Sequence, residues 1–387
     1  MTLIQDTDTL ARFCAACAHH PYVTVDTEFL RERTYYAQLC LVQLAHPGRG
    51  PEGAVLIDTL ADRLSLDPLL DLFRNREVVK VFHAARQDLE IFQVDAGVIP
   101  KPFFDTQVAA MVCGYGDQVG YETLARQIAG AKIDKSSRFT DWSRRPLTDA
   151  QKSYALADVT HLRQIYEVLS ARLTKSGRSA WVDEELAILL DPETYRTDPA
   201  DAWMRVKTRS SSTKFLCALK ELARFREIVA RERNVPRNRV FKDDALLELA
   251  AGRPHTPEDL SKSRLLTREA RKGDIADGIL AAVAASKNLS PAETPTPREM
   301  NGRKPGSEAL ADLLRVLLKA RSEAEGVAQR LVASSADLDR IAGEDAPDVP
   351  ALHGWRNDVF GRDAMRLKRG EIALSASGAD VKVVAIG

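Results

Sequence analysis

Tyr22-Val23-Thr24-Val25-Asp26-Thr27-Glu28-Phe29 alternates with period two and then runs apolar, as a strand with one buried face would. Residues two apart on a strand face the same side, so Asp26 and Glu28 are expected to project together from one edge of a sheet. Because burying a bare carboxylate is costly, this pair must be solvated, paired or bound to metal. The D-x-E pattern is common by chance, and an exposed strand end explains it at least as well.

The segments that follow this strand predict a mixed sheet. Further strands are expected at 37–44, 54–58 and 78–83 and near Phe103-Phe104, with helices at 66–74 and 88–93 and then in most of the chain to about Leu190. The short connections between the first three strands favour an antiparallel meander. Antiparallel strands followed by alternating helices and strands indicate an α/β ribonuclease-H-like mixed sheet with helices on its faces.

A third acidic residue, Asp88, lies in the first turn of the helix that follows the buried strand at 78–83. Open sheets of this type present ligands at the carboxyl ends of their strands. Helix N-terminal capping explains Asp88 equally well, because acidic residues favour that position. His83, which ends the strand, is interpreted as a packing residue rather than a metal ligand.

Tyr154 and a fourth acidic residue, Asp158, are one helical turn apart and therefore share a helix face. In a functional interpretation Asp158 binds a cation while the tyrosine hydroxyl positions a water. The alternative is a phenol packed on the core beside a solvated carboxylate. Because the free pKa of tyrosine is about 10, metal polarisation of the water would have to supply most of the activation.

The four carboxylates indicate metal chemistry more strongly together than any one of them does alone. Hard oxygen ligands without a His/Cys cluster favour Mg²⁺ or Mn²⁺ over Zn²⁺. Two such ions about 3.5–4 Å apart would stabilise the attacking and leaving oxygens of a phosphodiester displacement. These residues therefore predict metal-dependent phosphodiester hydrolysis. They do not specify the direction of cleavage or whether the substrate is RNA or DNA.

Composition places the chain among globular proteins of more than one domain. Its 387 residues are 44% hydrophobic and 28% charged. No apolar stretch approaches the length of a membrane span and the N-terminus lacks an export-signal pattern, so a cytoplasmic protein is expected. The five cysteines fit buried, reduced thiols, and Cys14 and Cys17 are expected to pack in a helix rather than bind zinc.

Helical patterns dominate the rest of the chain and predict two small all-α domains after the sheet. A loop near 191–199 marks the first boundary, and the proline-rich run Ser290-Pro291-Ala292-Glu293-Thr294-Pro295-Thr296-Pro297 is typical of an extended linker. Thr256 is expected to cap a helix that has Pro257 in its first position. The predicted organisation is a first domain at 1–195, a helical domain at 205–286, a linker at 287–306 and a second helical domain at 307–380.

The formal net charge of zero hides a local asymmetry. Between Arg205 and Lys242 there are twelve Lys/Arg and three Glu, an excess of nine positive charges. Charge-rich helices usually present a solvated surface, and the alternative is a face that follows the phosphates of a nucleic acid.

Three segments resemble the exonuclease motifs of the DEDD superfamily: Val25-Asp26-Thr27-Glu28-Phe29, His83-Ala84-Ala85-Arg86-Gln87-Asp88-Leu89-Glu90 and Tyr154-Ala155-Leu156-Ala157-Asp158-Val159. The tyrosine four residues before the last aspartate matches the tyrosine-bearing subgroup. Phe104-Asp105-Thr106-Gln107, and Asp141-Trp142 with Arg145-Pro146-Leu147, are similar to the ribonuclease D family. The resemblance covers roughly residues 1–190. Beyond it, 219–227 and 234–240 resemble an HRDC domain, and 355–361 more weakly a second one.

The resemblance implies a 3′-5′ exoribonuclease that releases nucleoside 5′-monophosphates and usually trims the 3′ ends of tRNA precursors. It implies two divalent metal ions, Mg²⁺ or Mn²⁺, held by the four carboxylates, with the catalytic residues Asp26, Glu28, Asp88, Tyr154 and Asp158. Phe29 and Leu30 are candidates to wedge or stack on the terminal nucleotide, since aromatic stacking tolerates any base, and His83 is a further candidate. Core packing explains Phe29 at least as well.

Two alternatives to this function stay open. One is a DNA 3′-5′ exonuclease of the same superfamily, and the other is an RNA-binding protein that only grips a 3′ end. The expected partner is RNA with a free 3′ end, and the HRDC-like modules would bind nucleic acid or shape substrate access. Nothing in the sequence requires more than a monomer.

Overall fold

The computed structural model describes every residue except 1, 135, 138–139, 297–306 and 387. Contacts divide the chain into two compact units, one made of Met1–Glu28, Cys40–Thr194 and Met300–Gly387, the other of Phe29–Leu39 and Tyr195–Glu299. The second half of the expected linker, 297–306, lies outside the described residues, and the expected domain boundaries stay predictions. Within the described part of the chain, no helix is long and apolar enough to cross a bilayer.

A six-stranded mixed sheet has the strand order β1-β4-β3-β2-β5-β6, and its strand β2 contains two of the four carboxylates. β3 and β4 are antiparallel, whereas β1 pairs with β4, β2 with β5 and β5 with β6 in parallel. This confirms the predicted mixed sheet and adds β1, a strand too short to show alternation. The strands are β1 (Thr2–Ile4), β2 (Tyr22–Leu30), β3 (Gln38–Ala45), β4 (Ala54–Ile57), β5 (Val79–Phe82) and β6 (Phe103–Asp105).

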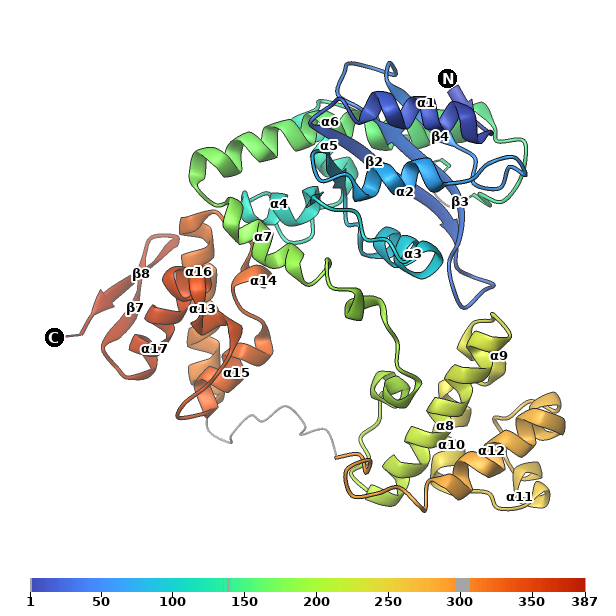
Figure 1. Ribbon diagram of the computed structural model, residues 1–387. Helices are drawn as coiled ribbons and strands as arrows, with labels where there is room; N and C mark the ends of the chain where they lie inside the picture. The colour runs from blue at the N-terminus through green and yellow to red at the C-terminus, as the bar shows by residue number, and fades with distance from the viewer. Residues whose placement is uncertain (1, 135, 138–139, 297–306, 387) are drawn as a thin grey trace. The chain divides into compact units, whose positions relative to one another are not determined.

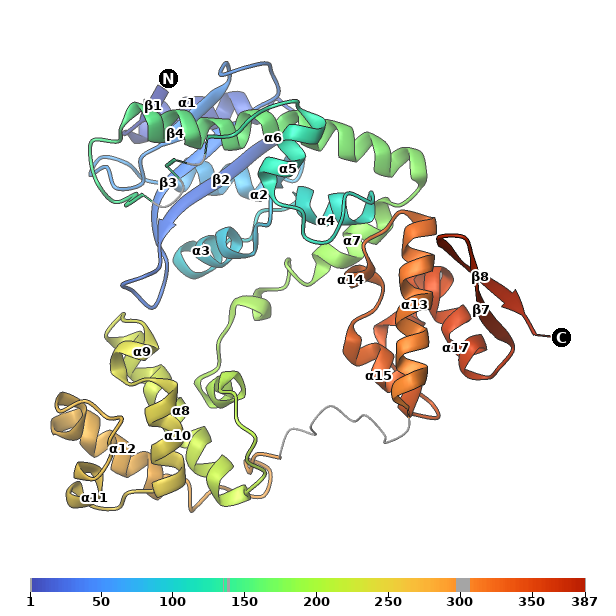
Figure 2. The same cartoon turned by 180° about the vertical axis from the view of Figure 1, so that it is seen from behind.

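Helices cover both faces of the sheet. α1 (Thr7–Cys17) and α2 (Asp67–Arg74) lie over one face and α6 (Asp149–Ser176) over the other (Figures 1 and 2). Cys14 and Cys17 are buried, free thiols on α1, as predicted. The remaining helices of this region are α3 (Arg86–Ala96), α4 (Thr106–Val112), α5 (Tyr121–Ile128) and α7 (Ser179–Ala187).

The 28-residue helix α6 is defined at both ends by its sequence. Thr148 and Gln151 form a capping box, in which each side chain accepts a hydrogen bond from the backbone N–H of the other. Gly177, at φ 67°, ends the helix in the left-handed conformation that favours glycine. Buried Val159 and Leu162 anchor α6 on the core, so side chains on the same helix have fixed positions relative to the sheet.

The helices of the second unit pack around α8 (Thr213–Glu232), whose apolar side chains lie in a core of their own. As predicted, Thr256 caps the next-to-last helix by accepting a hydrogen bond from the N–H of Asp259, and Pro257 lies in its first turn. The other helices are α9 (Arg237–Val240), α10 (Asp243–Gly252), α11 (Pro257–Ser261) and α12 (Gly273–Ala285). Short turns of 3-10 helix are η1 (Pro192–Tyr195), η2 (Pro199–Arg205) and η3 (Glu269–Arg271).

The C-terminal domain, 308–385, has a separate core within the first unit. Its last two elements form an antiparallel hairpin, β7 (Ile372–Ser377) and β8 (Asp380–Ala385), so this predicted all-α region is mostly rather than wholly helical. The alternating Val381 and Val383 and the turn at Gly378, φ 65°, account for the hairpin. The helices are α13 (Glu308–Glu325), α14 (Gln329–Val332), α15 (Ser335–Gly343), η4 (Pro350–Leu352), α16 (Gly354–Arg356), the π-helical η5 (Asn357–Gly361) and α17 (Arg362–Lys368).

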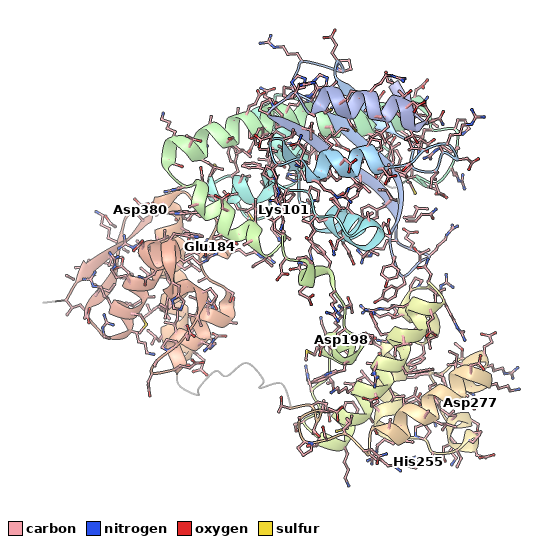
Figure 3. The ribbon with its side chains drawn as sticks, viewed as in Figure 1. Lys101, Glu184, Asp198, His255, Asp277 and Asp380 are labelled. Atoms are coloured by element: carbon pink, nitrogen blue, oxygen red, sulfur yellow. The ribbon has the colours of Figure 1, made fainter. Side chains whose placement is uncertain are left out.

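The C-terminal domain is fixed to α7 by stacked rings and ion pairs. The rings of Trp181 and Trp355 stack with centroids 4.3 Å apart, and Arg356 pairs with Glu184 and Glu185. Glu184 projects from α7 toward this domain (Figure 3). These contacts explain why the C-terminal domain belongs to the same compact unit as the sheet.

Candidate active site

Three of the four carboxylates come together between β2 and α6. Oxygen atoms of Asp26, Glu28 and Asp158 all lie within 4.8 Å of one another. Asp26 and Glu28 alternate along β2 as predicted, and Asp158 comes from α6. Asp158 is buried, whereas the other two are partly exposed, so the group is open on one side to solvent.

Two hydroxyl groups, one on a buried and one on a half-buried residue, hydrogen-bond to the backbone on either side of Asp158. Thr24, on the same face of β2 as the carboxylates, donates from its hydroxyl to the carbonyl of Val159 at 2.8 Å. The Tyr121 hydroxyl donates to the carbonyl of Ala157, also at 2.8 Å. Neither residue was predicted for the site. For Thr24 a local signal exists, because a polar side chain on the buried face of an apolar strand needs a hydrogen-bond partner.

The like charges of this group oppose ionisation. Burial raises the pKa of Asp26 well above its usual range, and the negative charges of Asp158, Asp88 and Glu28 raise it further. Burial, together with the charges of Asp158 and Asp26, likewise raises the pKa of the Tyr121 phenol. A divalent cation between the carboxylates would remove this repulsion, and carboxylate oxygens are the donors that Mg²⁺ and Mn²⁺ prefer.

Asp88 reaches the same region from α3. Its side chain is 7% exposed and accepts a hydrogen bond from the Thr27 hydroxyl. Burial raises the pKa of Asp88 to about 7, although the bond from Thr27 lowers it. Asp88 is not part of the group of three, yet its charge acts on Asp26. The N-cap of α3 is Ala85, and Asp88 lies in the first turn as predicted, where an acidic side chain also favours the helix N-terminus.

Tyr154 lies one turn before Asp158 on α6 and is partly exposed. Its ring packs against Trp142, with the ring centroids 6.1 Å apart. Together with Lys132 and Ala157 it lines a cavity of about 390 Å³. The cavity therefore reaches α6 at Tyr154, one helical turn before Asp158.

The segment that carries Trp142 is anchored to the sheet by Arg145. The guanidinium Nε donates to Asp58, just after β4, at 2.9 Å, and Nη2 donates to the carbonyl of Cys40 on β3 at 2.7 Å. Asp58 is buried, so this is a well-shielded ion pair. Arg145 thereby fixes the ring of Trp142 against which Tyr154 packs.

The three residues proposed to contact a nucleotide have different surroundings. The His83 Nδ1 lies 3.0 Å from the Thr106 hydroxyl, its ring packs edge-on against Tyr121, and burial lowers its pKa. Phe29 and Leu30 end β2 and are half-buried. Contact between these side chains and a nucleotide stays a prediction.

The positive charge between 205 and 242 is partly neutralised within the second unit. Arg226 pairs with Asp243 at 2.7 Å, and Glu227 lies within 4.0 Å of both Arg205 and Arg237. Eight cations of this range are exposed. Arg205 and Arg224 lie beside Glu227 and Glu221, and the other six are Lys207, Arg209, Lys214, Arg233, Arg239 and Lys242.

Comparisons with known proteins point to the same chemistry. Residues 1–174 match the family model for a 3′-5′ exonuclease, and residues 216–283 match the HRDC domain model. The chain is 62% identical over 383 residues to a ribonuclease D of Jannaschia sp., with 99% of each chain covered. It is 51% identical over 387 residues to a ribonuclease D of Granulibacter bethesdensis, with 100% of this chain and 97% of that one covered.

A solved structure gives the same result in three dimensions. The crystal structure of Escherichia coli RNase D, described as an exoribonuclease involved in structured RNA processing, matches with a TM-score of 0.81 and 29% sequence identity. The match covers 95% of this chain and 98% of that one. A second HRDC domain at 307–380 stays a prediction.

Proposed function

Because the chain belongs to the ribonuclease D family and is a 3′-5′ exoribonuclease, we propose that it cuts RNA with the help of two divalent cations bound by its four carboxylates. The observation that carries this proposal is the grouping of Asp26, Glu28 and Asp158 within 4.8 Å, with the charge of Asp88 acting on Asp26. Three carboxylates this close, with a fourth charge acting on one of them, would repel a phosphodiester unless cations lay between them.

The carboxylates divide into two ligand sets that share Asp26. Asp26, Glu28 and Asp158 would hold one ion, and Asp26 with Asp88 would hold the other. When bound, such ions stabilise the developing charge on the attacking and leaving oxygens and lower the pKa of water. Asp26 would contribute to both sets, and the charges of Asp158, Asp88 and Glu28, which come from both sets, raise its pKa.

The remaining residues of the site would orient the reactants. Tyr154 would hold the attacking water by a hydrogen bond, since a phenol is too weak a base to deprotonate it. The water oxygen would attack the terminal phosphorus and lose a proton to solvent. The bond from phosphorus to the 3′-oxygen of the preceding nucleotide would break, that oxygen would take up a proton from solvent, and a nucleoside 5′-monophosphate would leave. The shortened RNA keeps a 3′-hydroxyl, so the same step repeats.

The substrate that we propose is a tRNA precursor with extra 3′ nucleotides. Phosphate contacts supply affinity without sequence information, which suits an enzyme that removes any terminal nucleotide. The exposed cations Lys207, Arg209, Lys214, Arg233, Arg239 and Lys242 would make such contacts. We expect the enzyme to act as a monomer.

Digestion of a 5′-labelled tRNA precursor tests the proposed function. In Mg²⁺ the product ladder should shorten stepwise to the mature 3′ end, with nucleoside 5′-monophosphates released. Asp26→Ala should bind the precursor but leave it intact. Faster digestion of single-stranded DNA of matched sequence, or RNA binding without turnover by the wild-type protein, would contradict the proposal.

A further inference from the structure

The turn between β5 and α3 contains a strained residue. Ala84 has φ 57°, in the left-handed region that residues other than glycine adopt only rarely. Its side chain is exposed, so packing does not compensate for the strain. Such a conformation persists only where the surroundings impose it, and such residues concentrate near functional sites.

Asp105, at the end of β6, imposes this conformation. Its Oδ1 accepts from the N–H of Ala84 at 3.0 Å and its Oδ2 from the N–H of Ala85 at 2.9 Å. Oδ1 also accepts from the N–H of Gln107 at 2.8 Å, and the side chain is 1% exposed. Because backbone donors engage both oxygens, Asp105 is a brace for the turn rather than a ligand for an ion.

The braced turn leads directly into the element that carries Asp88. Ala85 is the N-cap of α3, and its side chain cannot accept a hydrogen bond from the helix backbone. Asp88 follows three residues later. The register Phe82↔Asp105 between β5 and β6 brings the carboxylate beside the helix start. A carboxylate there satisfies amide groups that the helix itself leaves unpaired. The Asp88 carboxylate itself accepts a hydrogen bond from the Thr27 hydroxyl on β2.

We propose that Asp105 is a positioning residue for Asp88, which holds the turn in its strained form and so sets where Asp88 meets the second cation. The proposal rests on the proposed function, in which Asp88 and Asp26 bind that cation. The three-carboxylate group comes from β2 and α6, so its ion should not depend on Asp105.

Calorimetric titration with Mn²⁺ in the presence of AMP separates the two sites. Wild-type protein should bind two ions. Asp105→Asn keeps the side-chain shape but replaces one acceptor oxygen with an amide that cannot accept. It should weaken the second ion about 10–100-fold, the usual effect of disturbing the support of a ligand, and leave the first unchanged.

The outcomes of this titration separate the two hypotheses. Wild-type protein that binds no Mn²⁺ would contradict the proposed function itself. If a folded Asp105→Asn variant bound both Mn²⁺ ions with wild-type affinity, only the positioning role of Asp105 would be overturned.

Ala84→Gly tests whether Asp105 acts through the strained turn. Glycine adopts a left-handed φ without steric cost, so it should restore most of the lost affinity when added to Asp105→Asn. If Asp105 did not act through the turn, the double variant would bind the second Mn²⁺ ion as weakly as Asp105→Asn does. That result would overturn the proposal.

Ala84→Val keeps the proposal testable if Asp105→Asn does not fold. A β-branched residue raises the strain at the same exposed position while Asp105 is intact. The variant should weaken the second ion selectively, with circular dichroism and melting curves confirming the fold. Wild-type affinity for both ions in Ala84→Val would overturn the proposal.

Discussion

The two sides of the acidic site are built in different ways. Asp26, Glu28 and Asp158 come from a nine-residue strand and a 28-residue helix, so regular secondary structure sets their directions. Asp88 follows a strained turn and depends on the Thr27 hydroxyl for its orientation. The loss of a single hydrogen bond should therefore affect the second side more than the first, where backbone bonding within the strand and the helix adds to the Thr24 and Tyr121 hydroxyls.

Removing a carboxylate from the first side should have the largest effect. Asp158→Asn would lose an ion ligand and several kcal/mol of transition-state stabilisation, and so lower kcat roughly 10³–10⁴-fold in single-turnover assays with RNA. The same change removes a charge that opposes ionisation of Asp26, so the metal-free protein should melt at a higher temperature than wild type. A variant that keeps its activity and melts earlier would contradict both expectations.

Tyr154→Phe should have a smaller effect, because it removes orientation of the water and leaves both ligand sets intact. We expect the rate to fall roughly 10²–10³-fold, within the range for a positioned proton-transfer group. Mn²⁺ affinity should be unchanged. Tyr166→Phe, on the same helix, is the matched control and should keep the wild-type rate. An unaltered rate for Tyr154→Phe would show that the hydroxyl does not orient the water and that the ring serves only in packing.

Thr27→Val tests the second side directly. Without the hydroxyl, the Asp88 carboxylate loses its hydrogen bond from β2, so the Mg²⁺ concentration for half-maximal activity should rise about 10–100-fold. Thr27→Ser keeps the donor and should behave like wild type. Equal Mg²⁺ dependence of Thr27→Val and Thr27→Ser would show that Asp88 does not need this hydrogen bond.

The smallest expected effect is on stability as a function of pH. The pKa of Asp88 is about 7 in the folded protein against 3.8 for a free aspartate, so between these values the folded state binds more protons than the unfolded state. The metal-free protein should therefore lose stability as pH rises from about 4 to about 7. Bound Mn²⁺ replaces those protons, so it should raise the melting temperature more at about pH 8 than at about pH 5.5. Equal shifts at both pH values would contradict this account.

The side built from regular elements could be predicted from the sequence. Period two along the strand places Asp26 and Glu28 on one face, and a spacing of four places Tyr154 and Asp158 on one helix face. Both arguments need only local periodicity. The structure brings the three carboxylates of Asp26, Glu28 and Asp158 together.

The supports of Asp88 could not be predicted in the same way. Ideal alternation assigns Thr27 to the face opposite Asp26 and Glu28, so periodicity does not pair it with an aspartate 61 residues away. Asp105 is the N-cap of α4, which is a position that aspartate commonly occupies. Its longer-range role depends on the register of β5 and β6, which no local pattern specifies.

The surface charge of 205–242 is another feature that the sequence does not specify. The residue types give an excess of nine positive charges. Arg226, however, is buried and paired with Asp243, which lies outside that range. Pairing across a helical core depends on packing, so the number of cations on the surface follows only from the structure.

Anomalous scattering from a crystal grown with Mn²⁺ and AMP would show directly whether the four carboxylates bind two ions. We expect two peaks about 3.5–4 Å apart, one among Asp26, Glu28 and Asp158 and the other between Asp26 and Asp88. A single peak, or a pair of peaks that does not include Asp88 among its ligands, would contradict this expectation.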